Sequence, residues 1–174
     1  MEWREKIISR TPEEIRKDFA EVLKNWQRFP GNDDPSRTGC VCTILDDTTA
    51  DLVMPQEFLG EIPVAKSALY AFYSLEMAIR IGDHQEQVTS AASAFGPVQN
   101  SAQESTSKKY SGATRCPGFL RFSTSGFTGA GDQAFSAAMQ DRAGLLTDEL
   151  LDRIEKESNS PLTRAFVLYD REHR

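Results

Sequence analysis

The sequence predicts an α+β fold, in which an antiparallel sheet of about four to five strands carries helices packed on it. The strand-like segments near residues 40–54 are joined by a short polar turn, as in a hairpin, rather than by a helix. Segments with helical periodicity precede and follow them, which gives the order α-β-β-α-β-α-α-β. A chain of 174 residues is long enough for one domain with a sizeable core. We therefore expect residues 1–174 to form a single layered domain.

The first helix has a complete start signal. Thr11 supplies a capping hydroxyl, Pro12 occupies the first helical position, and Glu14 stands three residues after the cap. The segment from Pro30 to Arg37 contains two prolines and two aspartates, so we expect the helix to end before it in a loop. Between these signals, apolar residues recur on one helical face at Ile15, Phe19, Val22, Leu23 and Trp26.

A hairpin is expected next. The run from Cys40 to Leu45 is rich in thiol and β-branched side chains and predicts a buried strand. Asp46 to Thr49 is a turn sequence, because short polar side chains bond to their own backbone. Ala50 to Met54 is the expected return strand, and Pro55 to Pro63 is expected to be irregular.

A second long helix is expected from about Val64 to Ile81, ending at Gly82. Its many apolar residues suit a helix that is buried along most of its length. Glu76 and Arg80 form a favourable four-residue charge pair on the remaining face.

The remaining elements follow from weaker signals. Residues 83–111 lack apolar periodicity, and the polar part from 99 to 111 predicts a long loop. Phe119 to Thr124 predicts a strand, and Gly131-Asp132 is expected to open a third helix that ends near Gly144. Residues 145–174 are expected to add a helix capped by Thr147 and a closing strand from Leu162 to Tyr169.

Charge and composition restrict the partners. Lys and Arg number 20 against 26 Asp and Glu, so the net charge of −6 argues against nucleic acid as the main partner. No apolar run is long enough to span a membrane, and the charged start leads into no secretory apolar stretch. Three cysteines give no disulfide framework. These observations together predict a cytoplasmic protein.

Cys40-Val41-Cys42 raises the alternatives of a metal or redox pair and of buried structural thiols. A Cys-x-Cys pair without a second cluster is not a zinc spacing, and both histidines lie far away in the sequence. Alternating side chains on a strand would place the two thiols on one face. We expect buried thiols that behave as small hydrophobes and no metal site.

The segment from Ser125 to Asp132 is the most informative candidate site. A strand runs into Ser125-Gly126, a glycine-rich turn follows, and a helix begins. Backbone N–H groups that collect at a helix start suit a carboxylate or a phosphate. Ser125 and Thr128 could donate to such a ligand, while the carboxylate of Asp132 could cap the helix. The alternative is purely structural, with glycines that only relieve a tight turn.

The same segment resembles the haem-utilisation domain family GlcG/HbpS, which carries a Ser-Gly pair followed by Asp and a small-residue helix. The strand–turn–strand from Val41 to Val53 is similar to that family's hairpin, and Ala65-Lys66 matches the segment that enters its helix. The resemblance extends across about residues 11–140 and leaves residues 145–174 without a counterpart. It is consistent with a profilin-like layered domain.

The resemblance implies a pocket to which Lys66, Ser125, Gly126 and Asp132 contribute, and it implies haem as the ligand. Haem needs an axial ligand, and His84 is the only histidine in the middle of the chain. Tyr70 and Tyr73 could line a flat pocket, although aromatic residues at helical spacing also suit a core. The family resemblance further implies a homo-oligomer with its pocket near a subunit contact.

Three classes of function therefore remain open. The first is a non-catalytic protein that binds haem or another small molecule, with Lys66, His84, Ser125, Gly126, Thr128 and Asp132 as cofactor-binding residues. The second is a regulatory module that binds a protein partner without a cofactor. The third is an enzyme that acts on a small carboxylate or phosphate, with Ser125, Lys66 and Asp132 around the glycine turn and with Lys66 as a positive charge or a base.

Overall fold

The computed structural model describes residues 10–84, 86–91 and 111–174. These residues form five helices and a four-stranded sheet. In chain order the elements are α2 (Pro12–Arg28), β1 (Gly39–Asp46), β2 (Glu57–Gly60), α3 (Val64–Gly82), β3 (Ala113–Cys116), β4 (Leu120–Ser125), α5 (Gly129–Arg142), α6 (Asp148–Ser158) and α7 (Leu162–Glu172).

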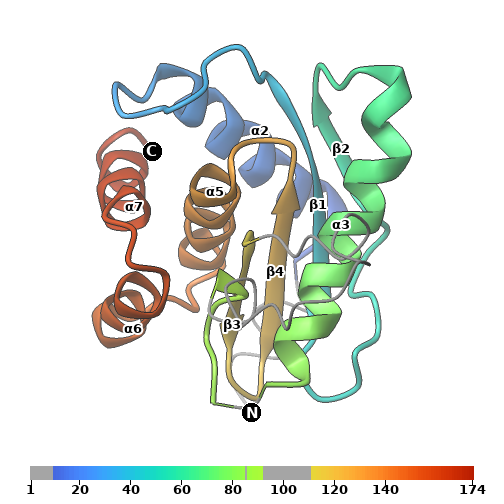
Figure 1. Cartoon of the computed structure of the whole chain (residues 1–174), viewed down its shortest axis with the longest axis vertical. Helices are drawn as coiled ribbons and strands as arrows, with labels where there is room; N and C mark the ends of the chain where they lie inside the picture. The colour runs from blue at the N-terminus through green and yellow to red at the C-terminus, as the bar shows by residue number, and fades with distance from the viewer. Residues whose placement is uncertain (1–9, 85, 92–110) are drawn as a thin grey trace, which may run out of the picture.

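The sheet has the strand order β2-β1-β4-β3, and all of its pairs are antiparallel. Helix α3 covers one face, while α2 and α5 cover the other (Figure 1). Helix α7 packs on the outside of α5, and α6 lies beside α7. The prediction of a single α+β domain with an antiparallel sheet is confirmed.

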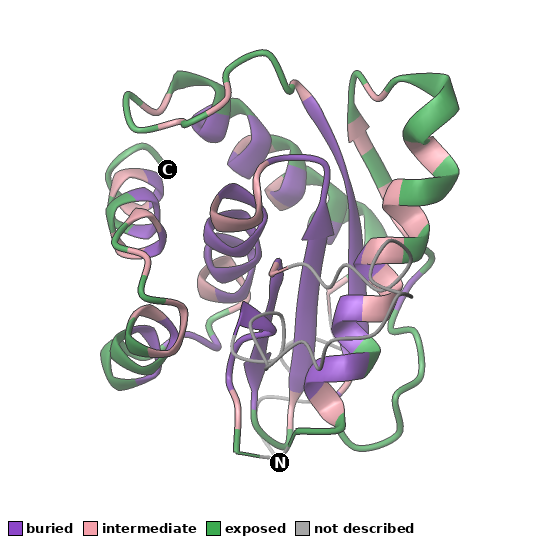
Figure 2. Ribbon diagram, in the orientation of Figure 1, coloured by how far each residue is buried: buried purple, intermediate pink, exposed green. Residues whose placement is uncertain are grey.

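The central pair, β1 and β4, is buried along almost its whole length (Figure 2). Side chains alternate between the two faces of a strand. Cys42 therefore joins the core under α2 and α5, whereas the hydroxyl of Thr43 lies 2.8 Å from that of Ser74 on α3. The sheet thus needs helices on both faces.

Local end signals located several helices correctly. Thr11 and Glu14 form the predicted capping box of α2, and Thr147 caps α6. Helix α5 begins at Gly129 instead of at Asp132, because the Thr128 side chain accepts the N–H of Gly131. The predicted cap at Asp132 is therefore wrong, and Thr128 has that role.

The predicted closing strand from Leu162 to Tyr169 is wrong, since this segment is helix α7. Its buried residues, Thr163, Phe166, Val167 and Asp170, are separated by three, one and three positions, which is a helical spacing. A short apolar run does not distinguish a strand from a buried helix by itself. Residues 145–174 therefore add two helices instead of a helix and a strand.

The C-terminal helix is integral to the core. The Phe166 ring on α7 packs edge-on against Trp26 of α2, with 4.9 Å between the ring centres. The fully buried carboxylate of Asp170 accepts hydrogen bonds from Asn25 on α2 (2.8 Å) and from Arg142 on α5 (2.8 and 2.9 Å). Helix α7 thus connects the first and third helices of the described chain.

The hairpin differs from the prediction in the position of its second strand. Ala50 to Met54 forms only an isolated bridge between Leu45 and Leu52, and the regular partner of β1 is β2. Strand β3 also arises where no strand was expected, in residues 113–116, which follow the weakly patterned stretch of residues 83–111. Both are four-residue strands at the edges of the sheet, too short to show an alternating pattern. Residues 99–110 of the predicted polar loop lie outside the described residues.

Two further expectations concern burial and membranes. Helix α3 is buried on one side only, and much of its N-terminal half is exposed (Figure 2). The expectation of a helix buried along most of its length is therefore wrong. Within the described residues, none of the helices combines the length and apolar character needed to cross a membrane.

A buried ion cluster holds one end of the sheet. Oδ1 of Asp47, which follows β1, accepts hydrogen bonds from Nε of Arg115 on β3 (2.6 Å) and Nε of Arg121 on β4 (2.7 Å). Oδ2 of Asp47 accepts the N–H of Gly118 in the turn between those strands (2.6 Å). Burial tends to raise the pKa of Asp47, but these hydrogen bonds outweigh it and hold the pKa below its usual value.

We expect Asp47→Asn to lower the free energy of unfolding at neutral pH by about 3 kcal/mol, because two buried guanidinium groups lose their counter-charge. The pKa of Asp47 is lower in the folded state than in the unfolded state, where it is about 3.9. The charged carboxylate therefore stabilises the fold fully above a pH of about 3.9, and this stabilisation is lost as the pH falls through the pKa of the folded state. The difference between wild type and variant should therefore shrink in acid. Urea denaturation at neutral and acidic pH measures this difference. The control is Asp51→Asn at an exposed carboxylate, and an equal loss there would contradict the assignment.

Candidate functional site

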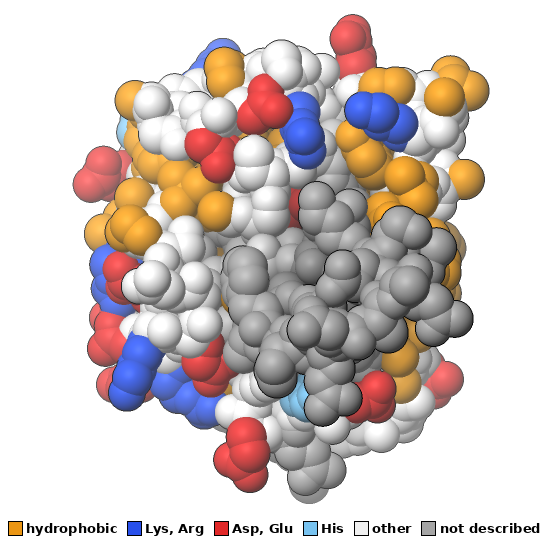
Figure 3. Space-filling model, in the orientation of Figure 1, with side chains coloured by type: hydrophobic (Ala, Val, Ile, Leu, Met, Phe, Trp, Pro, Cys, Tyr) orange, Lys and Arg blue, Asp and Glu red, His pale blue; other side chains and the backbone are white. Residues whose placement is uncertain are grey.

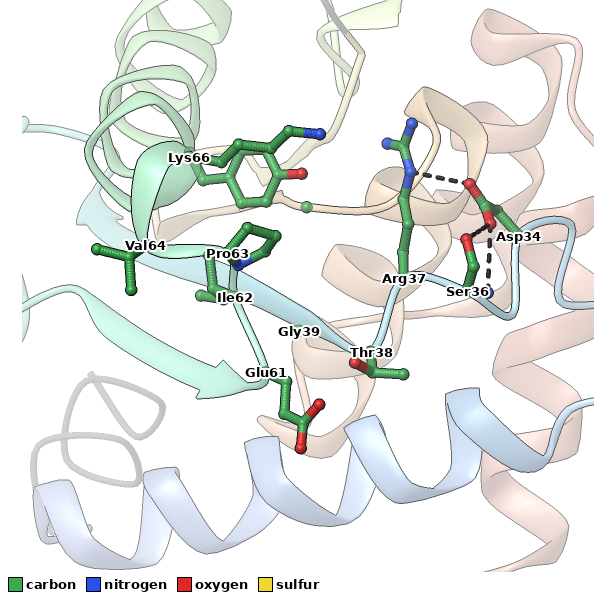
Figure 4. A pocket seen from close by; sticks show the side chains of 12 residues that line it. Asp34, Ser36, Arg37, Thr38, Gly39, Glu61, Ile62, Pro63, Val64 and Lys66 are labelled. Carbon is green, nitrogen blue, oxygen red and sulfur yellow. Dashed lines mark hydrogen bonds and ion pairs between the residues drawn. The ribbon is translucent and has the colours of Figure 1, made fainter.

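A cleft of about 690 Å³ opens at the end of the sheet where β4 ends and α3 begins (Figure 4). Three segments that are far apart in the sequence form its walls: the loop before β1, the connection from β2 into α3, and the turn after β4. A volume of this size suits a small organic ligand. The lining residues are Asp34, Ser36, Arg37, Thr38, Gly39, Glu61, Ile62, Pro63, Val64, Lys66, Tyr70 and Gly126.

The N-terminal turn of α3 forms one wall of the cleft. Pro63 occupies the cap position, and within the described part of the chain no side chain caps the first turn of this helix. The first N–H groups of a helix have no partner within the helix, and the helix dipole makes this end positive. This wall of the cleft therefore favours a negative charge.

The cleft carries a cation on each side. The Lys66 side chain extends from α3 toward the guanidinium of Arg37 in the loop before β1 (Figure 4). The backbone N–H of Lys66 donates to the carbonyl of Pro63, but among the described residues its side-chain ammonium has neither a hydrogen-bond nor an ion-pair partner. Its ammonium, with three N–H donors, can therefore bind a ligand.

Two contacts hold Arg37 in place. Its Nε lies 2.9 Å from Oδ2 of Asp34, and another of its guanidinium nitrogens donates to the carbonyl of Phe127. Arg37 carries five N–H donors, so these contacts leave donors for a ligand. A hydrogen bond from the Ser36 hydroxyl, with smaller help from Arg37, lowers the pKa of Asp34. The acid is therefore charged at neutral pH and steadies the guanidinium.

The second acid of the cleft, Glu61, points away from Lys66 and toward α2 (Figure 4). The two cations therefore face the space between them, while one carboxylate is paired and the other is turned away. Although the lining carries two carboxylates as well as two cations, the cations face the centre of the cleft. Such a local field favours an anionic ligand.

The structure brings two of the predicted site residues together, since Lys66 and Gly126 both line the cleft. Ser125 pairs with Val41 and so faces α3, as the cleft does, but its side chain is buried beside the cleft. Asp132 lies on α5, on the other face of the sheet. The residues suggested for an enzyme, Ser125, Lys66 and Asp132, are therefore not in one site.

The hollow predicted at the start of the third helix is filled by the protein's own groups. The Thr128 hydroxyl accepts the N–H of Gly131 (3.0 Å) and donates to Asp33 (2.7 Å). The buried carboxylate of Asp132 accepts the N–H of Phe127 (2.8 Å). Burial raises the pKa of Asp132 well above its usual value, and this hydrogen bond offsets only part of the effect. Neither Thr128 nor Asp132 is among the residues that line the cleft, whereas Gly126 is.

His84 is not in the cleft. It follows the C-terminal end of α3, whereas Lys66 is near the N-terminal end, and the 19 residues of this helix span about 28 Å. The described residues therefore do not place the predicted axial ligand beside the predicted pocket. Of the described residues that line the cleft, Tyr70 alone is of a type that ligates haem iron, and four of the lining side chains, Asp34, Arg37, Glu61 and Lys66, are charged. Haem binding stays a prediction that rests on the resemblance.

Sequence reasoning missed Arg37 and placed Tyr70 in the cleft only as one option. Asp34 and Arg37 stand three residues apart in a loop that was assigned no role. An acid and a base at this spacing next to a strand are the signal that could have indicated an ordered loop. The cleft itself forms from segments at residues 34–39, 61–70 and 126, so no local pattern reveals it.

The cysteines form no site of their own. All three are free and buried, and the thiols of Cys40 and Cys42 lie 3.9 Å apart on the core face of β1, as predicted. Within the described ranges, no group of three or more His, Cys, Asp or Glu side chains could hold a metal ion. Burial raises the pKa of the Cys40 thiol, and it raises that of Cys116 to about 11.

The chain matches no family model, no curated protein and no solved structure. The resemblance to the haem-utilisation domain therefore rests on the sequence pattern alone.

Gly126 should be essential for the geometry of the cleft. Its φ of +155° is unusual for other residues, and an added Cβ would lie 2.4 Å from the carbonyl oxygen of Gly39. We expect Gly126→Ala to lower the free energy of unfolding by about 2 kcal/mol, as measured by chemical denaturation. Gly144→Ala is the matched control, because that glycine also has a positive φ but open space around it. If the two variants lost equal stability, the close contact would have no role.

Thiol reactivity tests the assignment of the cysteines. Because the thiolate is the reactive form, raised pKa values and burial should protect Cys40 and Cys116 at mildly alkaline pH. We expect Ellman's reagent to modify no cysteine in the native protein and to modify three after denaturation. Rapid modification of a thiol in the native state would show a reactive cysteine instead.

Proposed function

We propose that this protein binds a small organic anion, and that the carboxylate or phosphate of the ligand lies between Lys66 and Arg37. The observation that carries the proposal is the pair of cations facing each other across the cleft, next to the uncapped start of α3. A binding role without catalysis agrees best with the separation of Ser125 and Asp132 from Lys66.

The side chains of the cleft have different roles in binding the ligand. Lys66 acts as a mobile point charge, whereas the guanidinium of Arg37 is held by Asp34 and by the carbonyl of Phe127. A guanidinium that is already ordered loses little freedom on binding, which favours affinity. The hydroxyl of Tyr70 offers a further hydrogen bond, and Ile62, Pro63 and Val64 offer apolar contact to the rest of the ligand. This combination suits a small acid with a short carbon skeleton.

We place this function in the cytoplasm. The three cysteines are buried and form no disulfide, which is typical of proteins in a reducing compartment. Small organic acids and phosphates are general solutes of such a compartment. A haem-loaded protein is the alternative, and the ligand test below includes it.

We expect a thermal-shift panel of acetate, succinate, citrate and inorganic phosphate to raise the unfolding temperature for at least one anion, because a ligand that binds only the folded state stabilises it. Isothermal titration with that anion should then show Lys66→Met weakening binding by about tenfold or more, the value of one charge-assisted hydrogen bond. Higher ionic strength should weaken binding in the wild type.

The matched control is Lys24→Met, which removes an exposed lysine from α2, outside the cleft. Equal losses in the two variants would show a non-specific charge effect and would reject the site. If no anion shifts the unfolding temperature, the proposal fails. Haemin, titrated in parallel, separates the two ligand classes: a saturable Soret change that Tyr70→Phe abolishes would replace the anion by haem.

A further inference from the structure

The turn between β4 and α5, residues 126–128, contacts both the cleft and the hydrophobic core. Gly126 lines the cleft. The ring of Phe127 is buried and packs against Trp26 of α2 and Phe135 of α5, with 5.4 and 5.5 Å between the ring centres. One residue of this turn therefore faces the ligand space, and the next residue belongs to the core.

Asp132 holds this turn from the side of α5. The residue is 5% exposed, and its carboxyl group accepts the N–H of Phe127 over 2.8 Å. The backbone of Gly126 is a further hydrogen-bond donor to the same carboxyl group. Two consecutive residues of the turn are thus bound to one buried side chain.

The turn also holds the loop before β1, which carries Arg37. The carbonyl of Phe127 accepts a hydrogen bond from the guanidinium of Arg37, and the Thr128 hydroxyl donates to Asp33 over 2.7 Å. Basic side chains lie at the surface near this loop and near the start of α3 (Figure 3). The contacts with the turn therefore fix one of the two cationic walls of the cleft.

Phe127 connects these two sets of contacts through its own backbone. Its N–H is bound to Asp132, and its C=O is bound to Arg37. The backbone between these two groups contains only two soft dihedral angles. A shift of the Phe127 N–H away from Asp132 would therefore also move the oxygen that holds Arg37.

The contact between Asp132 and the turn requires an oxygen acceptor rather than a charge. Burial disfavours the charged form of this carboxyl group and raises its pKa. The neutral carboxyl group keeps an oxygen that accepts an N–H, and the side-chain amide of asparagine has an acceptor of the same kind. Asparagine should therefore replace Asp132 in this contact, whereas alanine should not.

We infer that Asp132 is a positioning residue of the anion site, which orders Arg37 through the backbone of Phe127 without touching the ligand. This inference rests on the anion site proposed above. A guanidinium that is ordered beforehand loses less conformational entropy when the ligand binds. Asp132 thereby increases the affinity of a cleft that it does not line.

The order of Arg37 can be measured by NMR without any ligand. The Nε–H signal of Arg37, assigned by its absence in Arg37→Lys, should show a heteronuclear NOE typical of an ordered group in the wild type and in Asp132→Asn. Asp132→Ala should lower this NOE toward the value of a free arginine. The matched control is Met139→Ala, which removes a buried side chain about two turns further along α5 and should leave the signal unchanged.

A second variant at the same position keeps the test decisive if Asp132→Ala does not fold. Asp132→Ser retains a polar group, but its side chain is one bond shorter and should not reach the N–H of Phe127. Circular dichroism should show that each variant keeps its helical content. If neither variant folds, Asp132 is required for the fold itself, and the positioning role is rejected.

Isothermal titration with acetate, succinate, citrate and inorganic phosphate measures the effect on binding. For an anion that binds the wild type, Asp132→Ala should raise the Kd by about two- to tenfold, whereas Asp132→Asn should stay within about twofold. Met139→Ala should bind like the wild type although it is less stable.

The outcomes separate this inference from the proposed function. If Asp132→Ala keeps an ordered Arg37 and the wild-type affinity, the positioning role is overturned while the anion site stands. Equal losses in Asp132→Ala and Asp132→Asn would contradict the role of the oxygen acceptor. If none of the four anions binds the wild type, the proposed function fails, and with it the role of Asp132 in binding.

Discussion

The pairing of β1 with β4 is the constraint on which the rest of the structure depends. Both strands are buried on both faces, so the chain has to supply helices on either side of the sheet. This requirement brings the start of α3 to one end of the pair, beside Gly39 and Gly126, and produces the cleft. At the other end it buries Arg115 and Arg121, whose charges are balanced by the carboxylate of Asp47. The cleft and the ion cluster are thus two results of one arrangement.

The sequence predicted those parts of the fold that have local causes. Capping by Thr11 and Thr147 depends on a few neighbouring residues, and both helices begin as expected. The segment from Leu162 to Tyr169 was misassigned because a short apolar run fits a buried strand and a buried helix equally well. Only the elements that pack against it decide between the two. The edge strand β2 was missed for a similar reason. The strand that pairs regularly with β1 is not the segment directly after the turn but a later one, and no local signal marks it.

The candidate site was predicted in part. Lys66 and Gly126 were identified and do share a cleft, although it lies beside the expected hollow. Thr128 and Asp132 belong to a closed turn, because their oxygens already accept the backbone N–H groups that a ligand would have used. Arg37 could not be found, since its importance comes from a contact with Phe127, 90 residues away in the chain. Long-range contacts of this kind leave no pattern in a single sequence.

The contact between the two ends of the described chain also affects how the protein is made. Trp26 and Asn25 of α2 are covered by Phe166 and Asp170 of α7. During synthesis, α2 leaves the ribosome long before α7 has been made. The apolar face of α2 is therefore not yet covered by α7. Folding therefore finishes only after translation has passed Asp170, and until then the apolar face of α2 is free to make other contacts.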